Sequence, residues 1–387
     1  MNTKRVLHVK NFAHLSPLTL EFGDLTIFVG PQATGKSLLL QLFKLILDQG
    51  AIAHSLKRHG FVWSGDFAAS NRLYFGEGFE QIWHKDTSVM WKGGRQSLLH
   101  YKKLPDRKER VFYIPAQRAL IFQQNSWPRS FDVFRNTDPF VVRNFSEQIR
   151  RFLEGMQSSL LFPRERRLHR TIRERLEDTM FRGASLEIVT EESVKRLMLT
   201  MPHGDRLPYL GWSAGQREFV PLLLGAYWLL PLGRNPRRAL QWVIVEEPEM
   251  GLHPAAVEST LLVVLELLNR GYKVILSTHS ADVVGMVWAL RFLQQCSTSL
   301  AVQEVRRLFA LKAHAHVESL ATTVLSKTMR VYYFQPQKPL VQVRDISSLD
   351  AFDEDDAVAE WGGITEFATR ANEAVARCAA MLEDNDV

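Results

Sequence analysis

Apolar and polar positions along the chain follow two periods, and each period indicates a different kind of element. Short runs that are apolar at every position or at alternate positions predict strands, whereas apolar residues three and four positions apart predict helices. The predicted strands span residues 5–9, 18–22, 25–29, 111–114, 186–189, 195–201, 206–210, 241–245 and 273–276. The predicted helices span residues 37–47, 138–178, 214–230, 254–268, 281–293 and 365–381.

The order of these elements predicts an α/β fold. Strands and helices alternate from residue 241 to residue 293, which favours a parallel sheet with helical crossovers. Residues 61–91 mix aromatic and polar residues with many glycines, and we expect a small antiparallel β region there. The helical stretch at 138–178 interrupts the α/β pattern, so we expect it to form a short inserted lobe.

Composition supports one large core. The chain has 387 residues, of which 46% are hydrophobic and 23% charged, so a sizeable core is feasible. No segment offers about 18 apolar residues free of charge, which is the length needed to span a membrane. Cys296 and Cys378 lie far apart and have no partner at ligand spacing, so neither a disulfide framework nor a zinc site is indicated. We expect a soluble, cytoplasmic protein without a membrane partner.

The net charge of +6 is unevenly distributed. Arginines are concentrated between residues 143 and 182, at positions 150, 151, 164, 166, 167, 170, 173 and 175. Such a cluster is compatible with a nucleic-acid surface. The same stretch also carries glutamates at positions 147, 154, 165, 174 and 177, which would form a salt-bridged, solvated face. Both interpretations stay open at this point.

The most specific motif is a glycine-rich loop between a predicted strand and a predicted helix. It reads, in order, Gly30, Pro31, Gln32, Ala33, Thr34, Gly35, Lys36 and Ser37, and Leu38 follows it. This matches the pattern G-x-x-x-x-G-K-[ST], in which backbone N–H groups hold a polyphosphate. In such a loop the lysine reaches the terminal phosphates and the serine hydroxyl is a ligand of Mg²⁺. We therefore expect bound ATP and Mg²⁺.

Adjacent carboxylates follow a second predicted strand. Glu246 and Glu247 come directly after the apolar residues 243–245. This arrangement would place Glu246 near the metal, and Glu247 would polarise the attacking water. By itself a Glu-Glu-Pro-Glu run is also a common turn, so the interpretation depends on the phosphate loop.

Two further motifs are weak when taken alone. Ser213 is a natural N-cap for the helix that follows, and the small residues Ala214 and Gly215, with Gln216, would let backbone N–H groups approach an anion. His279 comes at the end of a buried strand, where a histidine is most often a satisfied polar group. Structural roles therefore remain open for both motifs.

Taken together, and in this order, the four motifs resemble the ABC-type ATPases, in particular the RecF-like and OLD-like group. The resemblance implies Walker A at 30–37, the signature motif at 213–216 and Walker B at 243–247. It also implies a D-loop at 248–253 and the switch histidine at His279. Gln117 occupies the place of the family's Q-loop, where it would sense Mg²⁺ and the γ-phosphate. The start of the chain at residues 9–12 also looks like the opening of a RecF-like head.

The resemblance also implies an architecture. We expect a head with a mixed sheet, helices on both faces and an antiparallel β subdomain, assembled from residues 1–120 and 185–300. Residues 121–184 would be the helical, arginine-rich insertion, and residues 301–387 a C-terminal extension. The chain departs from the family at Glu246, where an aspartate is usual, and at Ala214, where a glycine is common.

In this family ATP is held between two heads, so the resemblance implies a homodimer or higher homo-oligomer that closes around ATP. Lys36, Glu247 and His279 would then be the catalytic residues. After His279 the chain shows no convincing set of strand-end carboxylates, so any nuclease or toxin effector would be a separate polypeptide. By analogy we expect a role in bacterial anti-phage defence. The alternative is a DNA-repair or chromosome-maintenance ATPase that binds duplex DNA, and a transporter subunit is a less favoured third reading.

Overall fold

A computed structural model describes residues 5–61, 67–91, 108–122, 126–135, 137–164, 167–231, 237 and 239–385. Its centre is a six-stranded sheet in the order β13-β12-β3-β11-β10-β5. These strands are β3 (Leu25–Val29), β5 (Val111–Ile114), β10 (Trp242–Glu246), β11 (Lys273–Thr278), β12 (Met329–Gln337) and β13 (Leu340–Asp345). Neighbouring strands run parallel except for β12 and β13, which pair antiparallel. The expected mixed sheet is therefore confirmed.

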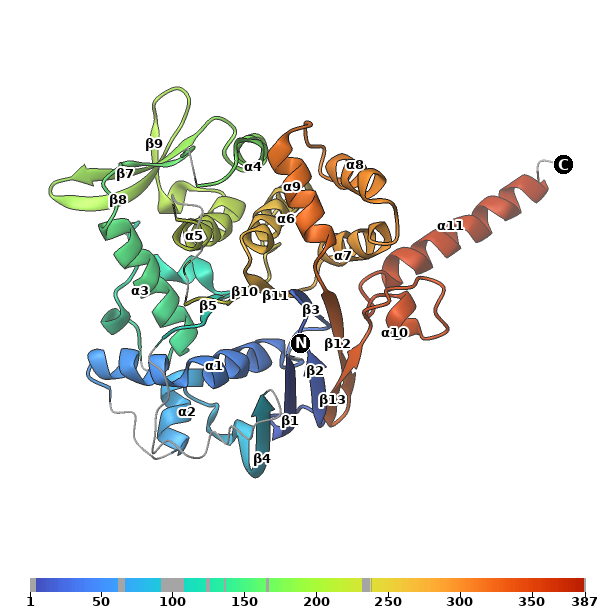
Figure 1. Ribbon diagram of the computed structural model, residues 1–387, viewed down its shortest axis with the longest axis horizontal. Helices are drawn as coiled ribbons and strands as arrows, with labels where there is room; N and C mark the ends of the chain where they lie inside the picture. The colour runs from blue at the N-terminus through green and yellow to red at the C-terminus, as the bar shows by residue number, and fades with distance from the viewer. Residues whose placement is uncertain are drawn as a thin grey trace.

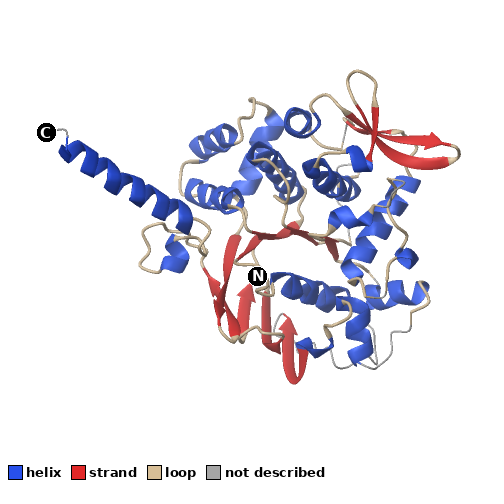
Figure 2. Ribbon diagram, turned by 180° about the vertical axis from the view of Figure 1, so that it is seen from behind, coloured by secondary structure: helices blue, strands red, loops and turns tan. Residues whose placement is uncertain are grey.

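Helices cover both faces of this sheet (Figures 1 and 2). One face carries α1 (Lys36–Arg58) together with a small sheet, and the opposite face carries α5 (Ala214–Leu229), α6 (Pro254–Asn269) and α7 (Ala281–Leu293). Because helices exclude water on both sides, every residue of β3, β5 and β10 is buried. This explains why these strands read as continuous apolar runs rather than alternating ones.

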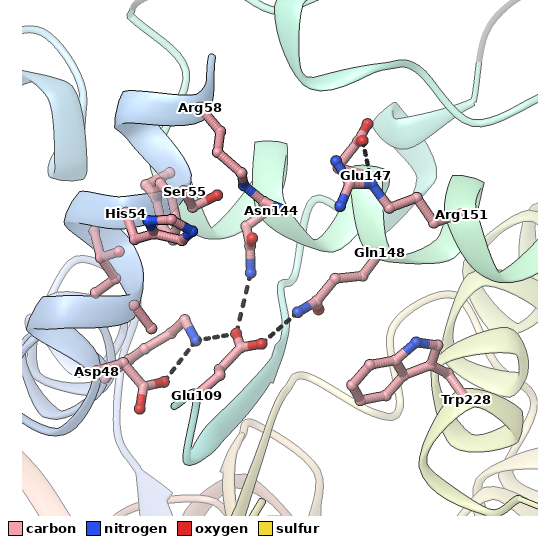
Figure 3. A pocket seen from close by; sticks show the side chains of 14 residues that line it. Asp48, His54, Ser55, Arg58, Glu109, Asn144, Glu147, Gln148, Arg151 and Trp228 are labelled. Carbon is pink, nitrogen blue, oxygen red and sulfur yellow. Dashed lines mark hydrogen bonds and ion pairs between the residues drawn. The ribbon is translucent and has the colours of Figure 1, made fainter. Parts of the chain in front are cut away.

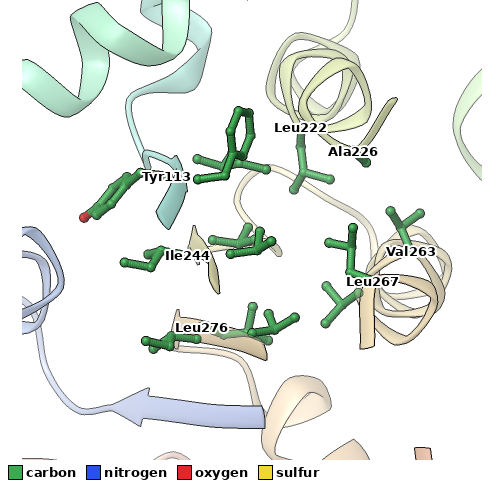
Figure 4. Close-up of a cluster of buried hydrophobic side chains, with 14 of the residues drawn as sticks. Tyr113, Leu222, Ala226, Ile244, Val263, Leu267 and Leu276 are labelled. Atoms are coloured by element: carbon green, nitrogen blue, oxygen red, sulfur yellow. The ribbon is translucent and has the colours of Figure 1, made fainter. Parts of the chain in front are cut away.

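The core lies between the sheet and its helices. Figure 4 shows Ile244 of β10 and Leu276 of β11 near Leu267 of α6, with Leu222 of α5 beside them. All four side chains are almost completely excluded from solvent. Full burial of one such side chain contributes about 1.5–3 kcal/mol. This packing fixes the ends of β3, β10 and β11, and those ends carry the chemistry described below.

A three-stranded antiparallel sheet lies beside α1, in the order β2-β1-β4. Its strands are β1 (Val6–Phe12), β2 (Leu18–Glu21) and β4 (Trp83–Trp91). The β region expected at residues 61–91 is only partly correct, because α2 (Phe67–Phe75) and the 3₁₀ turn η1 (Glu80–Ile82) precede β4, and residues 62–66 lie outside the described part. In α2 the buried side chains lie at positions 70, 71, 74 and 75, which is helical spacing.

The segment predicted as helical at 138–178 also contains a strand. It contains α3 (Phe140–Glu154), strand β6 (Leu160–Phe162) and α4 (Arg170–Leu176), followed by the π turn η4 (Glu177–Phe181). Gly155 ends α3, and β6 joins a second antiparallel sheet in the order β6-β7-β8-β9. The other strands of this sheet are β7 (Ser185–Glu191), β8 (Val194–Thr200) and β9 (Arg206–Pro208). Short 3₁₀ turns lie at η2 (Arg118–Ile121), η3 (Phe131–Val133) and η5 (Tyr209–Gly211).

Residues beyond 297 supply two strands of the central sheet and a helix that projects from it. Helices α8 (Thr298–Leu308) and α9 (Ala315–Leu325) lead into β12, which pairs with β3 beside the phosphate loop. After β13 come α10 (Asp356–Ala359) and α11 (Glu366–Asn385), and α11 projects away from the head (Figure 1). No helix among the described residues has the length and apolarity needed to cross a membrane.

A buried ion pair covers the start of the edge strand β5 (Figure 3). Lys44 Nζ donates to Asp48 Oδ2 at 2.9 Å, to Glu109 Oε1 at 2.7 Å and to the Val111 carbonyl at 2.6 Å. In turn, Asp48 accepts the N–H groups of Arg110 and Val111 at 2.7 and 3.1 Å. Two side chains one turn apart on α1 thereby satisfy backbone groups that an edge strand would otherwise leave open.

Candidate nucleotide-binding site

The phosphate loop connects the end of β3 to the start of α1, as the sequence predicts. Gly30 has φ 138°, and a Cβ there would lie 2.7 Å from the Phe334 carbonyl on β12, so only glycine fits. Gly35 has φ 89° and is the residue before α1. The loop therefore wraps tightly around the N-terminus of α1, where backbone N–H groups are free to bind an anion.

Lys36 lies in the first turn of α1 and is buried. Its Nζ donates to the carbonyls of Gly30 and Pro31 at 2.6 and 2.7 Å. Burial lowers the pKa of Lys36 to about 8, against the opposing effect of the carboxylates of Glu247, Glu246 and Glu249. The ammonium is thus held inside the loop, close to the carboxylates at the end of β10.

A cavity of about 650 Å³ opens beside the loop. Among the residues that line it are Glu247, His279 and seven of the predicted nucleotide-binding residues, namely Gln32, Ala33, Thr34, Gly35, Lys36, Ser37 and Leu38. The opposite wall consists of residues 13–14 and of residues from 78 to 84, around η1. This wall was not predicted, because β1 and β4, which lie outside the motif, bring it to the loop.

Glu246 is the last residue of β10 and is buried. Burial raises the pKa of Glu246, while hydrogen bonding to the Ser37 hydroxyl and to the Ala116 N–H opposes that rise. The Ala116 nitrogen lies 3.2 Å from Glu246 Oε2, and Oε1 is buried without a hydrogen bond of good geometry to the described residues. An open carboxylate oxygen beside a serine hydroxyl is a donor set that suits Mg²⁺.

Glu247 directly follows the strand and has φ 44°, which is unusual for a residue with a side chain. Its Oε1 lies 3.6 Å from His279 Nε2, and this interaction lowers the pKa of Glu247. Its N–H donates to the Ser277 carbonyl at 2.9 Å. The carboxylate is therefore held in its charged form beside Lys36 and His279, as a general base requires.

Glu249 has a structural role that the sequence analysis did not assign. Its Oε1 accepts the Thr278 hydroxyl and the His279 N–H, both at 2.7 Å. The carboxylate thus fixes the end of β11 and the backbone of His279. The Glu-Glu-Pro-Glu run contained this residue, but only the pairing of β10 with β11 shows which strand end it reaches.

Gln117 and the signature residues 213–216 lie outside the cavity at the phosphate loop. Gln117 is exposed, precedes η2 and is absent from the residues that line the cavity, so its role as a metal sensor stays a prediction.

Ser213 is exposed and forms a capping box with Gln216, in which Ser213 Oγ accepts the Gln216 N–H at 3.2 Å. A Cβ on Gly215 would lie 3.0 Å from the Gly251 carbonyl, so the helix packs closely on the turn after β10. Among described residues, 213–216 do not line the cavity of their own chain.

Comparison with known sequences agrees with this geometry. Residues 95–285 match a family described as "AAA domain, putative AbiEii toxin, Type IV TA system". The matched part contains Ser213, Glu246, Glu247 and His279, and the phosphate loop precedes it. This similarity extends over residues 95–285, just under half of the chain.

One curated protein that is similar to this chain is the Old nuclease of Escherichia phage P2, which is 39% identical over 57 residues. That alignment covers 15% of this chain and 10% of the nuclease, so the chain matches about a tenth of its relative's length. Among solved structures, an SMC head domain from Thermotoga maritima aligns at 11% identity and a TM-score of 0.37, over 88% of this chain and 98% of that one. The cbiO1 subunit from Clostridium perfringens aligns at 14% identity and a TM-score of 0.34, over 73% and 82%.

The arginine-rich stretch is largely paired within the chain. Arg150 and Arg151 contact Glu147 at 2.9 and 2.7 Å, and Arg170 contacts Glu174 at 2.6 Å. Arg143 and Arg167 are buried and donate to backbone carbonyls. These contacts favour the salt-bridged face over the nucleic-acid surface for the described arginines. Arg166 lies outside the described residues.

Proposed function

We propose that this ATPase head binds ATP with Mg²⁺, hydrolyses ATP and uses the cycle to close and open a pair of heads. The observation that carries the proposal is the convergence of Lys36, Glu246, Glu247 and His279 at one edge of the sheet, beside the cavity at the phosphate loop. Parallel strands end at this edge, and ligands bind there in open α/β sheets.

Each of these residues then has a defined task. The loop N–H groups and Lys36 bind the phosphates, and Ser37 and Glu246 hold Mg²⁺. The bound metal ion would neutralise charge that develops on the transferred phosphoryl group. Glu247 orients and polarises the attacking water, and His279 holds the Glu247 carboxylate and lies near the γ-phosphate.

The exposed signature cap supports a composite site between two copies. Ser213 and Ala214 are exposed at the start of α5, where the helix dipole and free N–H groups favour an anion. We therefore place the γ-phosphate held by one copy against Ser213 and Gly215 of another. This contact exists only while the γ-phosphate is present, so ATP closes the pair and hydrolysis releases it.

The descriptions of similar proteins support a proposal for the effector and the biological setting. The family description names a toxin and a toxin–antitoxin system, and the matched relative is a phage nuclease. We propose that the closing pair gates a separate nuclease or toxin in anti-phage defence. The projecting helix α11 is exposed along its described side chains and is available for contact with such a partner.

The direct test is steady-state ATP hydrolysis with matched variants. Lys36→Ala removes the charge that meets the phosphates and should abolish nucleotide binding. Glu247→Gln should retain ATP, lose about 10²-fold or more in kcat and accumulate as a closed dimer. Binding is measured with a fluorescent ATP analogue, and dimers by light scattering.

Glu258→Gln is the control, because Glu258 is a half-exposed carboxylate on α6 that pairs with Arg175 of α4 and does not line the cavity at the loop. It should keep the wild-type rate. A Glu247→Gln protein that hydrolyses ATP as fast as wild type would show that another group polarises the water. Absence of ATP binding by the wild-type chain would refute the proposed function itself.

A further inference from the structure

Arg118 and Arg143 are the largest fully buried charged side chains among the described residues, and no role was assigned to Arg118 above. It follows the Ala116–Gln117 dipeptide after β5 and is the first residue of η2. A guanidinium with no exposure must find acceptors for its N–H groups inside the protein. Its acceptors therefore show what it holds together.

The acceptors are three backbone carbonyls from two separate elements. Arg118 Nε donates to the Glu218 carbonyl at 2.8 Å, and the two terminal nitrogens donate to the carbonyls of Glu246 and Glu247 at 2.8 and 2.9 Å. Glu218 belongs to α5, five residues after the signature serine, and its carboxylate also lies 3.7 Å from Arg118 Nε. One rigid, planar group thus spans the signature helix and the two catalytic carboxylate positions.

The Glu247 end of this link is conformationally sensitive. With φ 44°, Glu247 adopts a backbone conformation that persists only when surrounding contacts hold it. Arg118 holds its carbonyl, and the Ser277 carbonyl holds its N–H. A small displacement of the guanidinium would therefore change the direction in which the Glu247 side chain leaves the backbone.

The signature end of this link is hydrogen-bonded to the same turn, η2. The Tyr209 hydroxyl donates to the Ala119 carbonyl at 2.9 Å, and Tyr209 lies directly before the signature segment. Because Arg118 and Ala119 are neighbours in η2, the start of α5 and this turn are joined at two points. A shift of the signature helix would be transmitted to the end of β10.

We propose that Arg118 is a positioning residue that couples the signature helix of each head to Glu247 of the same head. This inference rests on the composite site of the proposed function. A γ-phosphate held by one copy and engaged by Ser213 of the other would then set the Glu247 of that second copy, which acts on its own ATP. Hydrolysis at the two sites of a pair is therefore cooperative.

The test is Arg118→Lys in the full chain. Lysine keeps the charge but replaces the planar fork by one nitrogen, which cannot hold the three carbonyls in the same arrangement. ATP affinity and ATP-dependent dimers should stay within about twofold of wild type, while kcat falls about tenfold or more and the Hill coefficient for hydrolysis falls to about 1. Dimers are measured in the Glu247→Gln background, where hydrolysis does not interfere.

Arg143→Lys is the matched control, because Arg143 is equally buried but donates to the Leu73 carbonyl and lies over Phe131, away from the strand end. Arg143→Lys should lower the free energy of unfolding, and any fall in kcat should be accompanied by a fall in ATP affinity. If Arg118→Lys does not fold, Tyr209→Phe loosens the second tie and should lower kcat and the Hill coefficient in the same sense.

Two results would overturn the coupling. One is an Arg118→Lys protein with wild-type kcat and Hill coefficient. The other is an Arg118→Lys protein whose ATP affinity and kcat fall together, as expected for Arg143→Lys. In either case wild-type hydrolysis and dimer closure would remain, so the proposed function would stand. If the wild type neither hydrolyses ATP nor dimerises with it, the proposed function fails first.

Discussion

At the residue scale, the properties of the site come from burial of charge beside charge. Lys36 loses hydration at the start of α1, and three carboxylates near it compensate only in part, so its pKa is lowered to about 8. Glu246 and Glu247 are neighbours in sequence but differ in environment: burial raises the pKa of Glu246, and His279 lowers that of Glu247. Adjacent carboxylates therefore suit different tasks.

The pKa of Lys36 predicts how ATP binding depends on pH. Only the protonated ammonium attracts phosphate, and in the free protein the proton is lost as pH rises through about 8. The Kd for ATP should rise about twofold between pH 7 and 8 and then approach a tenfold rise per pH unit. Isothermal titration calorimetry at several pH values measures this, and a Kd that stays constant to pH 9.5 would contradict it.

At the element scale, α1 has two functions along its length. Its first turn carries Lys36 and Ser37, and two turns later Lys44 and Asp48 cover the start of the edge strand β5. Strand β5 leads to Ala116, whose N–H contacts Glu246. The ion pair therefore fixes the distance between the phosphate loop helix and the strand that supports the metal-side carboxylate.

Removing one partner of this pair should be costly. Lys44→Met leaves Asp48 and Glu109 without their buried cation, and breaking a buried pair in this way costs about 3–5 kcal/mol of unfolding free energy. Chemical denaturation measures the change.

The control is Arg170→Met, which breaks an exposed ion pair whose side chains are 78% and 42% accessible. Such surface pairs are worth about 0–1 kcal/mol. Equal losses in the two variants would show that the Lys44 cluster is not desolvated in solution.

At the scale of the whole molecule, the proposed site is divided between two surfaces of one head. The cavity contains the phosphate loop, Glu247 and His279, whereas Ser213 caps a helix whose start faces solvent. A complete phosphate environment under the proposed function needs both surfaces. One head supplies them in different places, so a second copy is required.

Ser213→Arg should separate nucleotide binding from closure. The bulky cation at the exposed cap blocks the approach of a second head but leaves the cavity of its own chain unchanged. We expect monomeric binding of an ATP analogue within about threefold of wild type, together with loss of ATP-dependent dimers and of hydrolysis. Light scattering with and without ATP decides this.

A second result at this scale would refute the composite site. If Ser213→Arg still dimerises with ATP and turns over at the wild-type rate, the signature helix has no contact with nucleotide. Ser158→Arg, at a partly exposed serine after α3, provides the control and should leave closure intact.

The sequence by itself determined the elements and the motifs whose physics is local. The glycine pattern specified the loop before α1, Ser213 and Gln216 specified a capping box, and apolar periods specified β3, β10, β11 and the helices between them. Each of these depends on groups within a few residues of one another, so the order of residue types is sufficient. The α/β fold with a mixed sheet was predicted correctly on this basis, and the roles of the site residues stay predictions.

Only the tertiary structure decided which distant groups meet. It placed β12 beside β3, put a strand within the segment predicted as helical at 138–178, paired the arginines with nearby glutamates, and directed Arg118 to carbonyls 100 to 129 residues away. Buried polar groups must find partners wherever packing brings them, and packing is set by the whole core rather than by any one segment. For that reason, the sequence alone did not show the link from the signature helix to Glu247.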